Sequence, residues 1–168
     1  MKKTIKEKIS DKLVNAFVKN KIISAIPSKY TKKLTEADKF RKLCENKIKD
    51  PIIGFKAGGT GIPLMKKLKE KEPFIASVFK KNLIKSGKKV KINKFTLGIE
   101  LEVCYLIKKN FFFSKGKITK KNVTKYISHM APCIEVVGYR QNYRRCIRVH
   151  SIVGGVYLFV AMCSSFCR

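Results

Sequence analysis

The first part of the chain has apolar residues at helical spacing, separated mainly by lysines. Spacings of three to four residues bring side chains onto one face of a helix, so an amphipathic helix is predicted here. The residues of its apolar face are Ile5, Ile9, Leu13 and Phe17. A basic amphipathic helix either packs its apolar face on a core or binds a membrane surface, and the pattern alone allows both.

A second helix is predicted from Thr35 to about Asn46. Thr35 is a favourable N-cap residue, and acidic residues follow it in the first turn. Ala37, Phe40 and Leu43 would share one face of this helix.

After the second helix the apolar pattern becomes typical of strands. Residues 52–56 are short and β-branched, and they meet a glycine-rich stretch at 57–61, which predicts a strand entering a turn. The turn lacks the Gly-Lys-Ser/Thr sequence of a phosphate-binding loop, so it is either a simple tight turn or a point of close backbone approach. Further strands are predicted over 74–79, 90–95 after a hairpin turn at Ser86-Gly87, 98–107, 111–113 and 133–137, together with a helix over 120–129 that Thr119 caps and Pro132 ends.

The charge balance is unusual for a chain of 168 residues. Lys and Arg number 39 against 11 Asp and Glu, so the net charge is +28, an excess that is typical of nucleic-acid-binding or membrane-binding proteins. Six of the basic residues are Arg, which leaves 33 Lys spread along the chain before Arg140. Nucleic-acid grooves instead interleave basic and aromatic residues and favour Arg. We therefore attribute the lysines to an AT-rich coding sequence and expect no specific nucleic acid.

The composition changes near Arg140. Residues 140–168 contain five Arg, no Lys and no acidic residue, whereas all 33 Lys and all 11 acidic residues precede them. We hypothesise a frameshift or decayed gene end just after Arg140, which would make 141–168 an aberrant tail.

Residues 151–167 are 17 uncharged residues, a marginal length for a membrane span, and no membrane association is expected. No signal peptide is evident and the six cysteines form no disulfide framework, so a cytoplasmic location is expected.

Three of the eleven acidic residues lie in predicted strands. Residues two apart in a strand face the same side, so Glu100 and Glu102 share one face, as they also would on a solvated edge strand. Glu135 lies in a nearly continuous apolar strand, where an unpaired carboxylate would be costly. The usual resolutions are a cationic partner, a metal ion or protonation. Two carboxylates from one strand and a third from another strand would suit Mg²⁺, which prefers oxygen ligands.

Several segments together resemble the 2-keto-4-pentenoate hydratases and the related 2-oxo-acid hydratase/decarboxylases of the fumarylacetoacetate hydrolase superfamily. The resemblance covers about residues 8–140 and stops where the composition changes. It rests on four segments in order: Gly54-Phe55-Lys56-Ala57-Gly58, Glu72-Pro73-Phe74, Ile99-Glu100-Leu101-Glu102-Val103, and Pro132-Cys133-Ile134-Glu135-Val136-Val137-Gly138-Tyr139-Arg140. Members of that family run on for roughly another hundred residues, so the resemblance implies a truncated chain.

The resemblance implies an α+β fold, with N-terminal helices over 1–50 and a partial catalytic domain over 51–140. That domain would be a mixed β-sheet or barrel of the fumarylacetoacetate hydrolase type, incomplete at its C-terminus. Phe74 stands where some hydratases have an acidic residue, and Ala76 stands where glycine is common, so the hydratase and decarboxylase assignments both stay open.

The resemblance also implies a function and a site. The intact enzyme would be a metal-dependent lyase of aromatic catabolism, a hydratase or a decarboxylase, and the present chain is either active or an inactive remnant. Its substrate would be a small 2-hydroxy-dienoate or 2-oxo acid, and it would be a homo-oligomer. Glu100, Glu102 and Glu135 would bind Mg²⁺ or Mn²⁺, Lys56 would transfer protons, and Gly58 and Arg140 would contact the substrate. The alternative is a basic protein that binds RNA or an anionic membrane.

Overall fold

The computed structural model describes residues 2–30, 33–69, 71–92, 96–113, 116–138 and 160–162. Two helices open the chain, as the sequence predicts: α1 (Ile5–Val18) and α2 (Leu34–Glu45). The side chain of Thr4 caps α1 in a reciprocal capping box with Glu7. The Thr35 cap predicted for α2 is wrong, because the helix begins at Leu34 and has no side-chain cap. Leu34 packs with Ala37, which draws it into the first turn.

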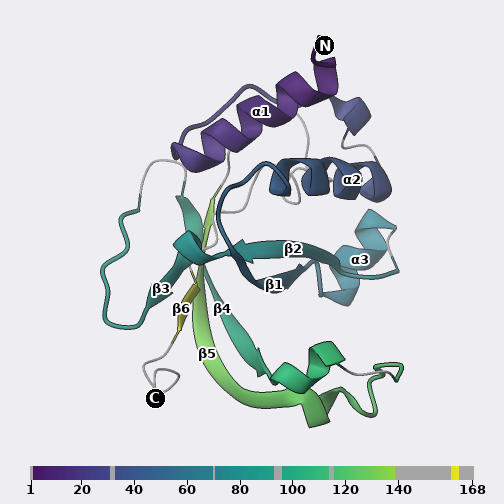
Figure 1. Ribbon diagram of the computed structural model, residues 1–168, viewed down its shortest axis with the longest axis vertical. Coiled ribbons are helices and arrows are strands. Elements are labelled where there is room, and N and C mark those ends of the chain that lie inside the picture. Colours follow the sequence, from purple (N-terminus) through teal and green to yellow (C-terminus); the bar gives the residue numbers. More distant parts are fainter. Residues whose placement is uncertain are drawn as a thin grey trace.

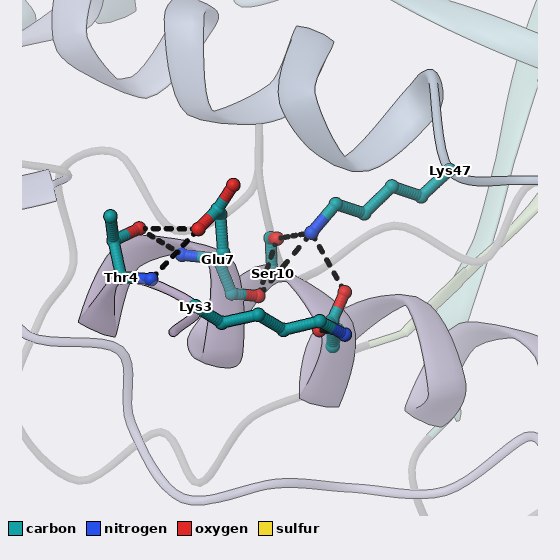
Figure 2. Close-up of polar contacts among 6 residues, drawn as sticks. Lys3, Thr4, Glu7, Ser10 and Lys47 are labelled. Carbon is teal, nitrogen blue, oxygen red and sulfur yellow. Dashed lines mark hydrogen bonds and ion pairs between the residues drawn. The ribbon is translucent and has the colours of Figure 1, made fainter. Parts of the chain in front are cut away.

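The two helices pack against each other at one end of the molecule (Figure 1). Their shared core contains Leu13 from α1 and the completely buried Phe40 from α2, together with Ile26 from the connecting segment. That segment includes the short 3₁₀ turn η1 (Ser28–Tyr30). Lys47, just after α2, reaches back to α1 and donates hydrogen bonds to the side chain of Ser10 and the carbonyl of Glu7 (Figure 2). On the apolar face of α1, Leu13 is buried and Ile9 packs against the same core, whereas Ile5 at the start of the helix is 66% exposed.

The first sheet is the antiparallel pair β1 (Ile52–Gly58) and β2 (Phe74–Phe79), both predicted from the sequence. A short helix that the sequence reading missed, α3 (Ile62–Leu68), connects them. Pro63 lies in its first turn, where the missing N–H of proline is harmless. A 3₁₀ turn, η2 (Lys80–Asn82), leads out of β2.

The second sheet has the strand order β3-β6-β5-β4 and is mixed. Its long elements are β4 (Thr96–Ile107) and β5 (Ile127–Gly138), paired antiparallel along their length. The short β6 (Val160–Met162) pairs antiparallel with β5 and parallel with β3 (Leu83–Lys85). The hairpin predicted at Ser86-Gly87 is wrong, because β3 pairs with β6; residues 88–92 form no strand, and 93–95 lie outside the described residues.

The region between β4 and β5 also departs from prediction. The phenylalanines at 111–113 belong to a 3₁₀ helix, η3 (Lys109–Phe113), instead of a strand. The helix predicted over 120–129 is only the 3₁₀ turn η4 (Val123–Tyr126), and from Ile127 the chain is already in β5. Pro132 therefore lies inside β5 and does not end a helix. The long β4–β5 ladder outweighs the local helical spacing of 120–129.

The two sheets contact each other through a small core. Val78 of β2 packs against Cys133 of β5, with Leu83 and Cys104 at its margin. In Figure 1 the β1–β2 pair lies between the helices and the long β4–β5 pair. The fold is thus a mixture of helices and small sheets. The described strands form two open sheets and no closed barrel. Within the described residues, no helix has the length and apolar character needed to span a membrane.

Candidate metal centre

The three predicted carboxylates converge on one face of the β4–β5 pair. Glu100 pairs directly with Glu135 across the ladder, and Glu102 pairs with Cys133. Directly paired residues of antiparallel strands point to the same face, and so do residues two apart. One carboxylate oxygen from each glutamate lies within 4.8 Å of the other two. The strand register therefore brings together three oxygen ligands that lie up to 35 positions apart in the sequence.

Glu135 is the buried member of this cluster. It is 3% exposed, whereas Glu100 and Glu102 are exposed at the rim. Burial raises the pKa of the Glu135 carboxyl above its usual value. The Lys56 ammonium opposes that rise, and the charges of Glu100 and Glu102 add to it. The cluster therefore holds more negative charge than Lys56 alone offsets, a condition that a bound cation would relieve.

Lys56 reaches the cluster from the other sheet. Along β1 the residues alternate, so that Lys56 points inward while Phe55 is 68% exposed. The Lys56 ammonium donates a hydrogen bond to Glu135 and forms an ion pair with it. Both side chains are largely removed from solvent, and the cross-strand partner of Lys56 is the small residue Ala76. A strand with its lysine inside and its phenylalanine outside indicates that the inner position serves the cluster.

Of the two residues predicted to contact the substrate, Gly58 and Arg140, the structure describes only Gly58. Gly58 ends β1, and a Cβ added there would lie 2.2 Å from the ring of Phe74. The close packing of Phe74 therefore explains this glycine, and a substrate contact at Gly58 stays a prediction. Arg140 lies outside the described residues, so its predicted role also stays a prediction.

Two thiols extend the same face beyond the carboxylates. Cys104 follows Glu102 by two positions, and Cys133 precedes Glu135 by two, so all four share the inner face of the sheet. Burial raises the pKa of the Cys133 thiol to about 12, and a hydrogen bond with Cys104 adds to the effect. The Cys133 thiol is therefore neutral at physiological pH. The sequence reading gave neither cysteine a role, although the two-residue spacing was the available signal.

Comparison with known proteins gives a match in fold and none in sequence. No family of known proteins and no curated protein matches the sequence. Among solved structures, 4-oxalocrotonate decarboxylase from Pseudomonas putida G7, complexed with magnesium and adipate, is similar with a TM-score of 0.68 and 12% identity. The same enzyme complexed with calcium and acetate gives a TM-score of 0.73 and 14% identity.

These likenesses cover 94% of this chain but only 60–61% of the decarboxylase chains. The chain thus has the fold of that part of 4-oxalocrotonate decarboxylase. The motif resemblance and the structural comparison thus both point to a 2-oxo-acid decarboxylase type of fold. Both neighbouring structures contain a divalent metal ion, and here the acidic cluster offers the oxygen ligands that such ions prefer.

Proposed function

We propose that the chain binds a divalent metal ion, Mg²⁺ or Mn²⁺, through Glu100, Glu102 and Glu135 and serves as a lyase acting on small 2-oxo acids. The observation that carries this proposal is the convergence of the three glutamate oxygens within 4.8 Å, with Lys56 against the buried one. The donor set fits the ion, since three carboxylates give hard oxygen ligands and negative charge. Such a site also leaves positions open for water and substrate.

Each residue has a distinct part in the proposed reaction. Glu135 would hold the ion from the buried side of the site, and Glu100 and Glu102 would hold it from the exposed rim. When bound, the metal supplies Lewis acidity toward the carboxylate and adjacent oxygen of a 2-oxo acid. Lys56 would transfer a proton at the substrate, because its ammonium lies within hydrogen-bonding reach of a proposed ligand.

Metal binding to the three glutamates can be measured directly. We expect Mn²⁺ to bind the wild-type chain and to raise its melting temperature, and Glu100→Gln to weaken binding by about tenfold or more, since it removes one charge from the ligand set. Glu100 is exposed, so this variant should fold normally. Calorimetric titration measures the affinity, and a thermal melt measures the stabilisation.

The matched control is Glu36→Gln on α2, which removes one negative charge from a partly exposed side chain outside the cluster. We expect the wild-type affinity for this control. If Mn²⁺ and Mg²⁺ both leave the wild-type melting temperature and titration heat unchanged, with or without a 2-oxo acid, the proposed function is wrong.

The reaction subtype can be resolved once metal binding is established. A decarboxylase releases CO₂ from a 2-oxo acid, whereas a hydratase adds water across a conjugated double bond and releases none. Incubation of the metal-loaded chain with 2-oxo acids and 2-hydroxy-dienoates, with CO₂ and loss of diene absorbance recorded together, distinguishes the two. The likeness to a decarboxylase supports the first outcome, although it extends over only part of that enzyme.

A further inference from the structure

Lys56 already occupies the carboxylate cluster as a cation. Its ammonium binds the Glu135 carboxylate, which is also the only buried member of the proposed metal-ligand set. Among the ion pairs formed by the described residues, this is the one that joins the two sheets. A positive charge fixed beside a metal ligand lowers the affinity of that ligand for another cation.

We propose that Lys56 is an internal counter-cation that competes with the metal for Glu135 and so sets the metal affinity of the site. This proposal rests on the proposed function. Binding of the metal at Glu135 would displace the lysine from the carboxylate. The released ammonium then has no carboxylate partner and is available to an anionic substrate. Metal loading and the freeing of Lys56 would therefore be one coupled event.

The geometry favours competition over simple coexistence. Glu135 is almost fully buried, and the Lys56 side chain is only 16% exposed, so water screens the pair poorly. The positive charges of the metal and the lysine would both be placed against one carboxylate group. Without the metal, Lys56 offsets part of the negative charge of the three glutamates, which keeps the cluster tolerable in the folded chain.

The experiment compares Mn²⁺ dissociation constants for the wild type and three variants, measured by the electron paramagnetic resonance signal of free Mn²⁺. We expect Lys56→Met to bind at least about tenfold tighter, and Lys56→Arg, which keeps the charge, to stay within about threefold of the wild type. Lys12→Met on the exposed surface of α1 is the matched control for removing one positive charge, and it should leave the affinity unchanged.

Folding of Lys56→Met is itself informative and is followed by circular dichroism with and without Mn²⁺. A variant that is unfolded alone but folds when Mn²⁺ is added supports the proposal, because the metal has replaced the missing cation. A Lys56→Met variant that binds no tighter than the wild type, or that does not fold at any Mn²⁺ concentration, overturns it.

A second measurement uses the wild-type chain alone. Acetic anhydride labelling read by mass spectrometry should show Lys56 modified about threefold faster or more at saturating Mn²⁺, with Lys12 as the internal reference, because an ammonium held by a carboxylate is protected. Absence of Mn²⁺ binding to the wild type would refute the proposed function. Normal binding with unchanged Lys56 labelling and equal affinities would refute only the competition.

Discussion

Gly58 shows how a single residue shapes the edge of the proposed site. The ring of Phe74 lies where a side chain at Gly58 would be, and Phe74 in turn packs against the fully buried Ala37 of α2. A missing Cβ thus allows the β1–β2 pair to close onto the helices. Lys56 lies on the same, less exposed face of β1, two residues before Gly58.

We predict that Gly58→Ala destabilises the fold by about 1–3 kcal/mol, the usual cost of overpacking a filled site. The cause is the added methyl group, which would lie 2.2 Å from a ring carbon of Phe74. Chemical denaturation with urea measures the difference in unfolding free energy.

Gly54 on the same strand is the matched control, because a Cβ added there meets no atom within 4 Å. Gly54→Ala should leave the stability near that of the wild type. Equal destabilisation by both substitutions would contradict the role assigned to Phe74, since it would show a general intolerance of side chains in β1.

The shared face of two of the carboxylates could be predicted from the sequence, whereas the contact of Lys56 with Glu135 could not. Glu100 and Glu102 are two apart in a strongly alternating strand, so their shared face follows from strand geometry alone. The contact between Lys56 and Glu135 spans 79 positions and two sheets, and no local spacing encodes it. In the sequence, only the motif resemblance distinguishes Lys56 from the other lysines. Its pairing with Glu135 required the packing of the two sheets.

The pair of helices depends on a polar link as well as on its apolar core. Ser10 of α1 is completely buried, and its hydroxyl both donates to the Glu7 carbonyl and meets the Lys47 ammonium (Figure 2). The same ammonium lies 2.7 Å from Asp11. A single lysine after α2 thus satisfies polar groups along one side of α1.

We predict that Lys47→Met lowers the unfolding free energy by about 1–3 kcal/mol, because the buried Ser10 hydroxyl and the Glu7 carbonyl lose a charged hydrogen-bond donor. Lys49→Met, two positions further on and exposed, removes the same charge and should have little effect. Urea denaturation compares the two variants. A loss of stability common to both would indicate a general charge effect in place of this link.

Secondary structure was predictable where the pattern was local and long. The helix at Ile5–Val18 and most of β4, predicted over 98–107, follow from periodicity that continues over two or more turns or several alternations, and β2 follows from a continuous apolar stretch at 74–79. The predictions are wrong where pairing with a strand far along the chain determines the secondary structure. Residues 120–129 have helical spacing, but pairing with β4 extends β5 back to Ile127. The pairing of β3 with β6 joins residues more than 70 positions apart, which no hairpin signal at Ser86-Gly87 could indicate.

The outer face of the β4–β5 pair exposes a row of apolar side chains. It is opposite to the carboxylate face, and its β4 residues include Leu101, which is 84% exposed. This apolar face includes Ile99, Leu101, Val103, Tyr105, Met130 and Ile134. None of these residues is charged, although 50 of the 168 residues in the chain are. Contiguous apolar surface of this kind promotes association with apolar partners or with itself.

Two opposing terms govern self-association of the chain through this apolar face. Burial of apolar side chains favours association, whereas the net charge of +28 on each copy opposes it. Salt screens the repulsion between copies, with a Debye length that falls from about 30 Å at 0.01 M to about 10 Å at 0.1 M. It leaves the uncharged face itself unaffected. Association should therefore strengthen as salt is added, which is the reverse of the behaviour expected for contacts held by ion pairs.

We predict that sedimentation velocity shows a larger associated fraction at 0.5 M than at 0.01 M NaCl, and that Leu101→Lys abolishes this increase. The lysine would place a charge in the centre of the apolar face, where its desolvation on contact is costly. Ile92→Lys adds the same charge at a residue that is 67% exposed and precedes β4, so it should associate like the wild type. If both variants lose association equally, net charge controls it; if neither does, a different surface is responsible.

Because the carboxylates occupy the opposite face, Leu101→Lys should keep the Mn²⁺ affinity of the wild type, which would separate the association surface from the proposed metal centre.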